Sequence, residues 1–319
     1  MIHNARLYIT MLRVRTQTAR RRLAGKTGES EKNVQFDRQV FQEVDGDTHA
    51  LSTVALIVEA AELAGPGRAA VLGCGSCTEI PIRLLNENFS YVDLVDLDAQ
   101  ALRIVEAQCR QWADANDGYR FYCTDLTGLI SQIVPRAQEI VAAATDPVGC
   151  LDDLGNLLQT TAPAFWRPPD EERYSLIVCA TVLTQLQATV RKRIGTIFLN
   201  RFPHYRDAMS SDERWRRRLW NFARRLEDGF IDHLETLAVP GGIICLSATV
   251  RVGWLTKVDA QILTTDGSWI ATRTSRLADY LRPWDEIIAE YEWKWPRNEQ
   301  EGPYWGRLYD VQAIIYRIS

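Results

Sequence analysis

Two glycines and an acidic residue in the first third of the chain have the types and spacing of a nucleoside-binding site. An apolar run at 69–72 ends at Gly73-Cys74-Gly75, a helical pattern follows, and a second alternating strand at 91–95 ends at Asp96. Glycines let a backbone approach a ligand closely, and a carboxylate can accept hydrogen bonds from both hydroxyls of a ribose. This strand–glycine turn–helix–strand–acid unit predicts a half-Rossmann site for a nucleoside.

The strands that must position this site continue along the rest of the chain. Apolar or alternating runs predict further strands at 120–123, 174–180, 243–249, 291–295 and 311–318. The last two lie close together in the sequence, so they can form a hairpin. A parallel sheet that ends in an antiparallel hairpin resembles the class I S-adenosylmethionine (SAM)-dependent methyltransferases, and the resemblance extends from about Thr48 to the C-terminus.

The resemblance implies an α/β fold with a doubly wound, mostly parallel seven-stranded sheet and a C-terminal antiparallel hairpin. It also implies SAM as the cofactor, because a dinucleotide site usually has G-x-G-x-x-G and this chain has Thr78 at the third glycine. The residues that it places at the cofactor follow the ends of the first four strands: Gly73, Cys74, Gly75, Glu79, Asp96, Leu97, Asp125, Leu126 and Ala180.

Two of these residues have a second interpretation. The family commonly carries an acid two residues before the first glycine, where this chain has Val71, and Glu79 could supply the missing carboxylate for the amino group of SAM. Glu79 could instead be an acid that the helix dipole favours in the first turn of the next helix. Asp125 fits the acceptor for the adenine amino group, and its rival interpretation is a turn aspartate that bonds to its own backbone.

For catalysis the sequence offers only two candidates, Thr181 and Gln185, which follow the fourth strand where methyltransferases place substrate and base groups. A missing base is compatible with methyl transfer, because the sulfonium is a strong electrophile and proximity can suffice. Cys74 and Cys77 have the C-x-x-C spacing of redox and zinc sites, but the sequence lacks two more zinc ligands at suitable spacing. We interpret both cysteines as small residues in a tight loop and predict no metal.

The composition restricts the kind of partner. The chain has 319 residues, 46% of them hydrophobic, which is enough for a large core, and its net charge of −4 argues against a general nucleic-acid binder. No run of eighteen apolar residues occurs and the N-terminus is too charged for a secretory signal, so we expect no membrane contact. Seven cysteines, most of them inside helix or strand patterns, are typical of reduced thiols in a cytoplasmic protein.

We expect an N-terminal helical lid at 1–47 and a SAM-binding domain at 48–319. The lid has the Arg-rich character of a transit segment, but we favour amphipathic helices that belong to the fold. Insertions are expected near 145–172, 190–235 and 252–275, the third with a hairpin that turns at 266–267.

The second insertion contains a basic helix with one apolar stripe, formed by Trp215, Leu219, Phe222 and Leu226. We interpret its arginines as a solvated face and not as an RNA-binding surface. Asp93, inside the second strand, is interpreted as an edge or packing residue.

The predicted acceptor is a small molecule, enclosed by the lid, the segment after Thr181 and aromatic residues near Trp254 and Tyr304-Trp305. The leading hypothesis is methyl transfer from SAM to a nitrogen, oxygen or carbon of a small metabolite. Two alternatives stay open: a SAM-consuming enzyme that releases methylthioadenosine by cyclisation, lysis or aminopropyl transfer, and a non-catalytic SAM-fold binding protein. A nicotinamide dehydrogenase is the least favoured. The sequence predicts neither the acceptor's identity nor the oligomeric state.

Overall fold

The computed structural model describes residues 48–111, 118–258, 261–264, 270–271, 277–297 and 306–319. The predicted lid at 1–47 therefore lies outside the described residues. The first elements in chain order are α3 (Thr48–Leu63), β1 (Arg68–Leu72), α4 (Ile82–Asn88), β2 (Tyr91–Asp96), α5 (Ala99–Gln111), β3 (Tyr119–Cys123), α6 (Leu129–Ala143) and α7 (Pro147–Thr160). They are followed by β4 (Tyr174–Ala180), α8 (Ala188–Arg201), α9 (Arg206–Ser211), α10 (Glu213–Leu237), β5 (Ala238–Val258), β6 (Gln261–Thr264), β7 (Ile270–Ala271), β8 (Glu286–Arg297) and β9 (Gly306–Arg317).

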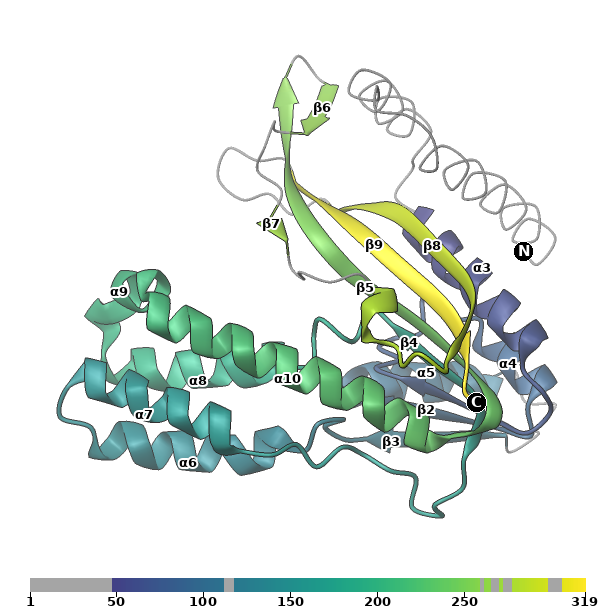
Figure 1. The fold of residues 1–319 in the computed structure, drawn as a ribbon, viewed down its shortest axis with the longest axis horizontal. Helices are drawn as coiled ribbons and strands as arrows, with labels where there is room; N and C mark the ends of the chain where they lie inside the picture. The colour runs from purple at the N-terminus through teal and green to yellow at the C-terminus, as the bar shows by residue number, and fades with distance from the viewer. Residues whose placement is uncertain (1–47, 112–117, 259–260, 265–269, 272–276, 298–305) are drawn as a thin grey trace.

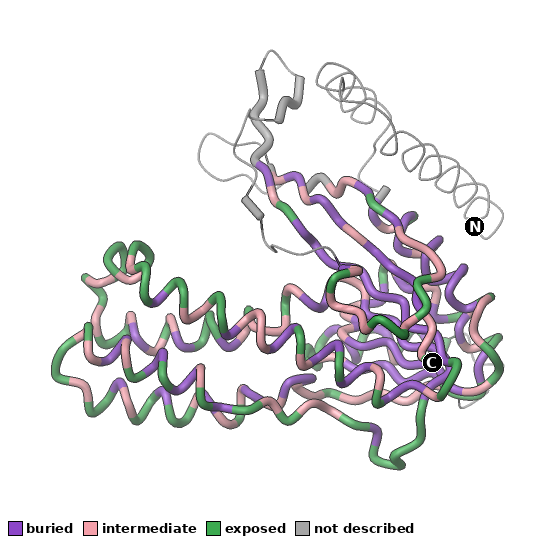
Figure 2. The backbone as a smooth tube through the Cα atoms, viewed as in Figure 1, coloured by how far each residue is buried: buried purple, intermediate pink, exposed green. Residues whose placement is uncertain are grey.

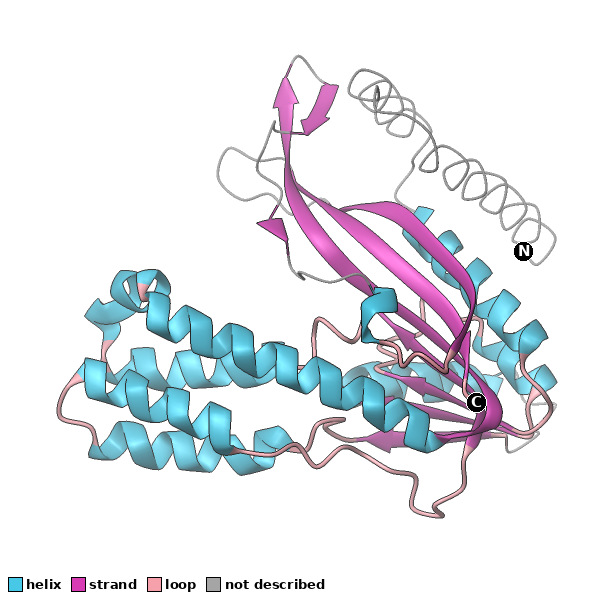
Figure 3. Cartoon of the chain, in the orientation of Figure 1, coloured by secondary structure: helices cyan, strands magenta, loops and turns pink. Residues whose placement is uncertain are grey.

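One sheet runs through the molecule in the order β3-β2-β1-β4-β5-β9-β8. Its strands are magenta in Figure 3. Neighbours from β3 to β5 pair in parallel, whereas β9 pairs antiparallel with both β5 and β8. The predicted α/β fold class, with seven principal strands and a C-terminal hairpin, is confirmed. The strand order reverses at β1, whose neighbours are β2 and β4, and ligands in such sheets bind at this switch point.

Both faces of the sheet are covered by helices. Successive side chains of each inner strand point to opposite sides, so each strand contributes to two cores. Val71 and Leu94 face a core formed with α3, α4 and α5. Leu72 and Val95, the next residues along, face a second core that includes Phe230 and other residues of the C-terminal half of α10. Figure 2 shows the buried strands between these layers. The sheet is therefore doubly wound, as predicted.

A third core lies outside the sheet, in a helical bundle of α6, α7, α8 and α10. Figure 1 shows these helices side by side, projecting away from the strands. Three residues of the predicted apolar stripe, Trp215, Phe222 and Leu226, are buried in this core, and Leu219 packs against it half-buried. Because the other half of α10 lies in a sheet core, this helix connects the bundle to the sheet.

The interpretation of the α10 arginines as a solvated face was wrong for two of them. The Arg225 guanidinium donates to the carbonyl oxygens of Leu158 (2.6 Å) and Thr161 (3.3 Å), at the C-terminal end of α7. Arg218 donates to the carbonyl of Asp152 at 2.6 Å. Last-turn carbonyls of a helix have no partner within it, so the Arg225 guanidinium stabilises this end of α7, whereas Arg218 contacts the middle of the helix.

One further prediction about local structure was wrong. Residue Glu79 does not lie in a first helical turn, since α4 begins only at Ile82, after Pro81. Proline disfavours the helical conformation of the residue before it, which extends the loop after β1. The turn expected at 266–267 lies outside the described residues, and the short strands on either side of it, β6 and β7, each pair with β5. They do so because β5 continues past its last pairing with β4, which leaves one edge open.

None of the helices in the described part of the chain combines the length and the apolar character that a membrane crossing requires.

Candidate functional site

The loop after β1 lies at the switch point and is hydrogen-bonded to the end of β2. The backbone N–H groups of Gly73 and Cys74 both donate to the Val95 carbonyl, at 2.7 and 3.1 Å. Gly73 has φ +70°, and a Cβ at this position would lie 2.1 Å from a methyl group of Val182, after β4. Gly75 has φ +52°, and no described atom lies within 4 Å of the place where its Cβ would be. One glycine therefore allows tight packing, and the other presents open backbone.

The carboxylate of Asp96 joins the ends of β1 and β2. One of its oxygens accepts from the Gly75 N–H at 2.7 Å and the other from the Asp98 N–H at 2.8 Å. A carboxylate has about four lone-pair positions, so each oxygen can still accept a ligand hydroxyl. The next residue, Leu97, is an exposed apolar side chain, 44% accessible. The structure therefore brings together four predicted residues: the two glycines, Asp96 and Leu97.

The C-x-x-C cysteines are inside this loop and are buried. A hydrogen bond with Cys77 and burial both raise the pKa of the Cys74 thiol. A thiol with a raised pKa is a poor nucleophile and a poor metal ligand. No group of three or more potential metal ligands occurs among the described residues. The raised pKa agrees with the interpretation of Cys74 as a small loop residue.

Asp125 follows β3 and is bonded within its own turn. One carboxylate oxygen accepts from the Thr127 N–H (2.9 Å) and hydroxyl (2.7 Å), and the other accepts from the Ile130 N–H (2.8 Å). These are the contacts of the rival interpretation, an aspartate that stabilises a turn and the start of α6. Leu126 beside it is buried. The adenine role of both residues stays a prediction.

The segment after β4 contains the two catalytic candidates. Thr181 has φ +57°, a left-handed conformation that is uncommon for a residue with a branched side chain. Its N–H donates to the carbonyl (3.0 Å) and the hydroxyl (3.1 Å) of Ser247 on β5, which holds this conformation. Residues in strained conformations are often found at functional sites. Ala180 is half-buried before it, and Gln185 is exposed one turn later.

Glu79 has a neighbour that the sequence reasoning missed. Its carboxylate, 31% exposed, lies 3.1 Å from Nε2 of His49, in the first turn of α3. Nδ1 of this histidine accepts a hydrogen bond from the Trp293 indole at 2.8 Å, and the Trp295 ring stacks on the imidazole at 3.9 Å. These four residues come from three separate segments, α3, the loop after β1, and β8, so no spacing in the sequence could relate them.

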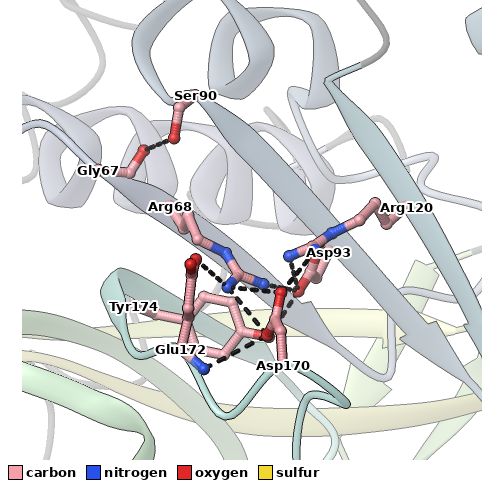
Figure 4. A network of polar contacts seen from close by, with 8 residues as sticks. All are labelled: Gly67, Arg68, Ser90, Asp93, Arg120, Asp170, Glu172 and Tyr174. Carbon is pink, nitrogen blue, oxygen red and sulfur yellow. Dashed lines mark hydrogen bonds and ion pairs between the residues drawn. The ribbon is translucent and has the colours of Figure 1, made fainter.

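A second polar cluster lies near the amino ends of the strands and is centred on an inner strand, not on the edge of the sheet (Figure 4). Asp93 is fully buried on the inner strand β2. Its carboxylate accepts from Arg68 (2.8 Å), Arg120 (2.7 and 3.1 Å) and the Tyr174 hydroxyl (2.6 Å). Of the two interpretations of Asp93, an edge residue or a packing residue, the first was therefore wrong, since β2 lies between β3 and β1, and the buried contacts agree with the second.

Two influences oppose each other in this cluster. Burial raises the pKa of Asp93, whereas the Tyr174 hydrogen bond and the Arg68 charge lower it. We assign an ionised carboxylate, because four donated hydrogen bonds reach its two oxygens. Arg68 also contacts Asp170 and Glu172 at 3.1 and 2.6 Å, which fixes the chain before β4. The cluster is at the end of the sheet opposite the glycine loop, so we assign it to stability.

Two surface hollows also lie away from the glycine loop. One, of about 290 Å³, is between α7 and α10, and the other, of about 520 Å³, is beside the Arg68 cluster. The predicted acceptor walls cannot be placed, since residues 304–305 and the side chain of Trp254 lie outside what the structure describes.

The sheet order, with its terminal antiparallel pair, decides the fold. It is the class I SAM-dependent methyltransferase fold. Similar solved structures include the N-methyltransferase NodS from Bradyrhizobium japonicum WM9, with 10% identity and a TM-score of 0.38; the match covers 84% of this chain and 94% of NodS. The magnesium protoporphyrin IX methyltransferase ChlM from Synechocystis PCC 6803, solved with bound SAM, has 13% identity and a TM-score of 0.36, with 94% and 89% covered. The [4+2]-cyclase SpnF has 12% identity and a TM-score of 0.42, with 86% and 84% covered.

Neither a family model nor a curated protein sequence matches this chain. The identities of 10–13% say nothing about substrate or reaction, which must be argued from the residues of the site.

Proposed function

We propose that the protein binds SAM across the carboxyl ends of β1 and β2 and transfers the methyl group to a small metabolite. The observation that carries this proposal is the open backbone of Gly75, 2.7 Å from the Asp96 carboxylate at the switch point of the sheet. Bound SAM supplies an electrophilic methyl sulfonium.

Several residues would hold the cofactor. Asp96 would accept from the ribose hydroxyls with the lone pairs that its two backbone contacts leave free. Exposed Leu97 would cover one face of the nucleoside, and Glu79 would receive the ammonium group of the methionyl part. Asp125 and Leu126 would lie at the adenine, as the family resemblance implies.

The acceptor is proposed to lie beyond Thr181, with Gln185, the lid and the aromatic residues near Trp254 and Tyr304-Trp305. The left-handed Thr181 supports this placement, because it turns the chain sharply at the end of β4. The acceptor's nucleophile would be held in line with the methyl group, and that positioning can supply much of the rate enhancement. A cytoplasmic location is part of the proposal, supported by seven cysteines that are all free thiols.

The cofactor site can be tested with a matched pair of variants. Asp96→Asn removes a charged acceptor from the proposed ribose contact, so it should weaken SAM binding by about 1.5–3 kcal/mol, or roughly 10- to 150-fold in Kd. Asp98→Asn, two residues on, keeps an acceptor for the N-terminal N–H groups of α5 and should leave binding unchanged. Isothermal calorimetry measures both. Equal affinities for the two variants would remove Asp96 from the site.

The reaction can be tested by incubating the protein with methyl-labelled SAM and a cell extract. Mass spectrometry should find the label in a small molecule and S-adenosylhomocysteine as the second product. Methylthioadenosine as the second product would indicate the non-methylating alternative, and label in protein or RNA would contradict the small-molecule acceptor. SAM binding without turnover would favour a binding protein, and thermal stabilisation by a reduced dinucleotide alone would favour the dehydrogenase.

A further inference from the structure

The contacts of His49 fix which of its ring nitrogens carries the proton. The side chain is 1% exposed, and Trp295 stacks on it with an interplanar angle of 13°. Trp293 donates its indole N–H to Nδ1 at 2.8 Å. An indole nitrogen can only donate, so Nδ1 must present a lone pair and the proton of the neutral imidazole must lie on Nε2.

This Nε2–H group is a buried donor with an incomplete contact. It lies 3.1 Å from an oxygen of Glu79, but the direction of the N–H does not meet the geometry of a hydrogen bond. No other described residue accepts from it. An unpaired buried donor is costly, and a small rotation of the partly exposed Glu79 side chain would complete the bond. Contacts of this kind often tighten only when a ligand binds.

Two further unpaired groups lie beside His49. Ser52 and Thr53 follow it at i+3 and i+4, positions that share one face of a helix. Both are buried, and neither hydroxyl has a hydrogen-bond partner among the described residues. One face of the first turns of α3 therefore carries three buried polar atoms without a hydrogen-bond partner among the described residues, which is independent support for a ligand group at this place.

We propose that His49 is the positioning residue for Glu79: Trp293 fixes the histidine tautomer, and Nε2–H orients the carboxylate so that it binds a primary ammonium group. The inference rests on the proposed function, in which this ammonium belongs to the methionyl part of SAM. A carboxylate that is held by one neutral donor keeps its full charge and its remaining lone pairs for the cation. The site should then discriminate SAM from analogues that lack the ammonium.

The tautomer can be measured in the full chain without any ligand. NMR of protein with ¹⁵N-labelled histidine should show a protonated Nε2 and an unprotonated Nδ1 for His49, with the signals assigned through His49→Gln. Trp293→Phe keeps a ring but removes the donor, so the ¹⁵N shifts should move toward a mixture of tautomers. A protonated Nδ1 in the wild-type protein would overturn the proposal.

The positioning role can be measured by binding. His49→Gln keeps an N–H donor and should hold SAM within about threefold of wild type, whereas His49→Phe keeps the ring and should lose about tenfold or more. Glu79→Gln should lose a similar amount. The double variant His49→Phe/Glu79→Gln should bind no more weakly than Glu79→Gln alone, because the histidine acts through the carboxylate.

Methylthioadenosine, which lacks the ammonium, serves as the control ligand and should bind all these variants equally. A purely structural role for His49 would weaken both ligands in His49→Phe and His49→Gln alike, with effects that add to Glu79→Gln, and melting temperatures would show the loss. Unchanged SAM affinity in Glu79→Gln would place the ammonium elsewhere and overturn the inference. If wild-type protein does not bind SAM, the proposed function fails, and the tautomer measurement still decides the His49 assignment.

Discussion

At the scale of single residues, Gly73 and Gly75 have similar backbone conformations but different surroundings. Gly75→Ala places a methyl group in open space, at the cost of about 1–2 kcal/mol for a left-handed non-glycine residue. The same methyl group would lie where the proposed cofactor approaches, so SAM affinity should fall while the fold persists. Gly73→Ala adds a collision with Val182 and should lower the melting temperature further. Calorimetry and thermal melts of both variants test this, and normal SAM binding by Gly75→Ala would contradict it.

Also at the residue scale, Glu235 in the last turn of α10 makes the free energy of unfolding depend on pH. Burial, and then the charge of Asp285, raise the pKa of this carboxyl from 4.5 to about 7. Between these two pH values the folded state therefore binds more protons than the unfolded state. The contribution of Glu235 to stability is present below about pH 4.5 and is lost as pH rises through 7. Glu235→Gln should remove this loss, which amounts to at most about 3 kcal/mol. Denaturant unfolding at pH 5 and pH 8 measures it, and parallel pH profiles of the two proteins would refute it.

At the scale of elements, α10 holds α7 through partly buried arginines as well as through apolar packing. Arg225→Ala leaves the carbonyls of Leu158 and Thr161 without this donor, so it should destabilise the protein by about 1–3 kcal/mol. The exposed Arg216 on the same helix provides the control, and Arg216→Ala should change stability by less than about 0.5 kcal/mol. Urea unfolding of both variants decides this, since equal stabilities would mean that the contacts to α7 contribute nothing.

At the scale of the whole molecule, the continuous α10 should make the bundle and the sheet unfold together. Phe222 lies in the bundle core and Phe230 in a sheet core, two turns apart on one helix. If either core unfolds, α10 loses packing contacts, and the other core then loses the α10 residues that complete it. We expect one calorimetric transition, with equal calorimetric and van't Hoff enthalpies. Two separated transitions, or a variant Phe222→Ala that melts only the bundle, would show that the two parts are independent.

The sequence alone determined the sheet and the edge at which the site lies. Tyr174–Ala180 has the predicted bounds of its strand, β1 stops before Gly73, and β2 ends at Asp96, as predicted. These features are local: they depend on alternation along a few residues and on the backbone freedom of glycine. The handedness of strand connections then brings the carboxyl ends together, so the neighbourhood of Gly75 and Asp96 could also be predicted.

Only the tertiary structure decided what surrounds that edge. His49 and Trp293 are 244 positions apart, and neither has a neighbour in the sequence that marks it as polar and buried. β6 and β7 pair with β5 because β4 ends earlier and leaves that edge of β5 open. The turn residues at 266–267 cannot predict this pairing, because it depends on the length of a distant strand. Asp93 became the centre of an ion-pair cluster because its strand is inner and its guanidinium partners arrive from β1 and β3. Contacts between distant segments follow from packing, and a local pattern cannot specify them.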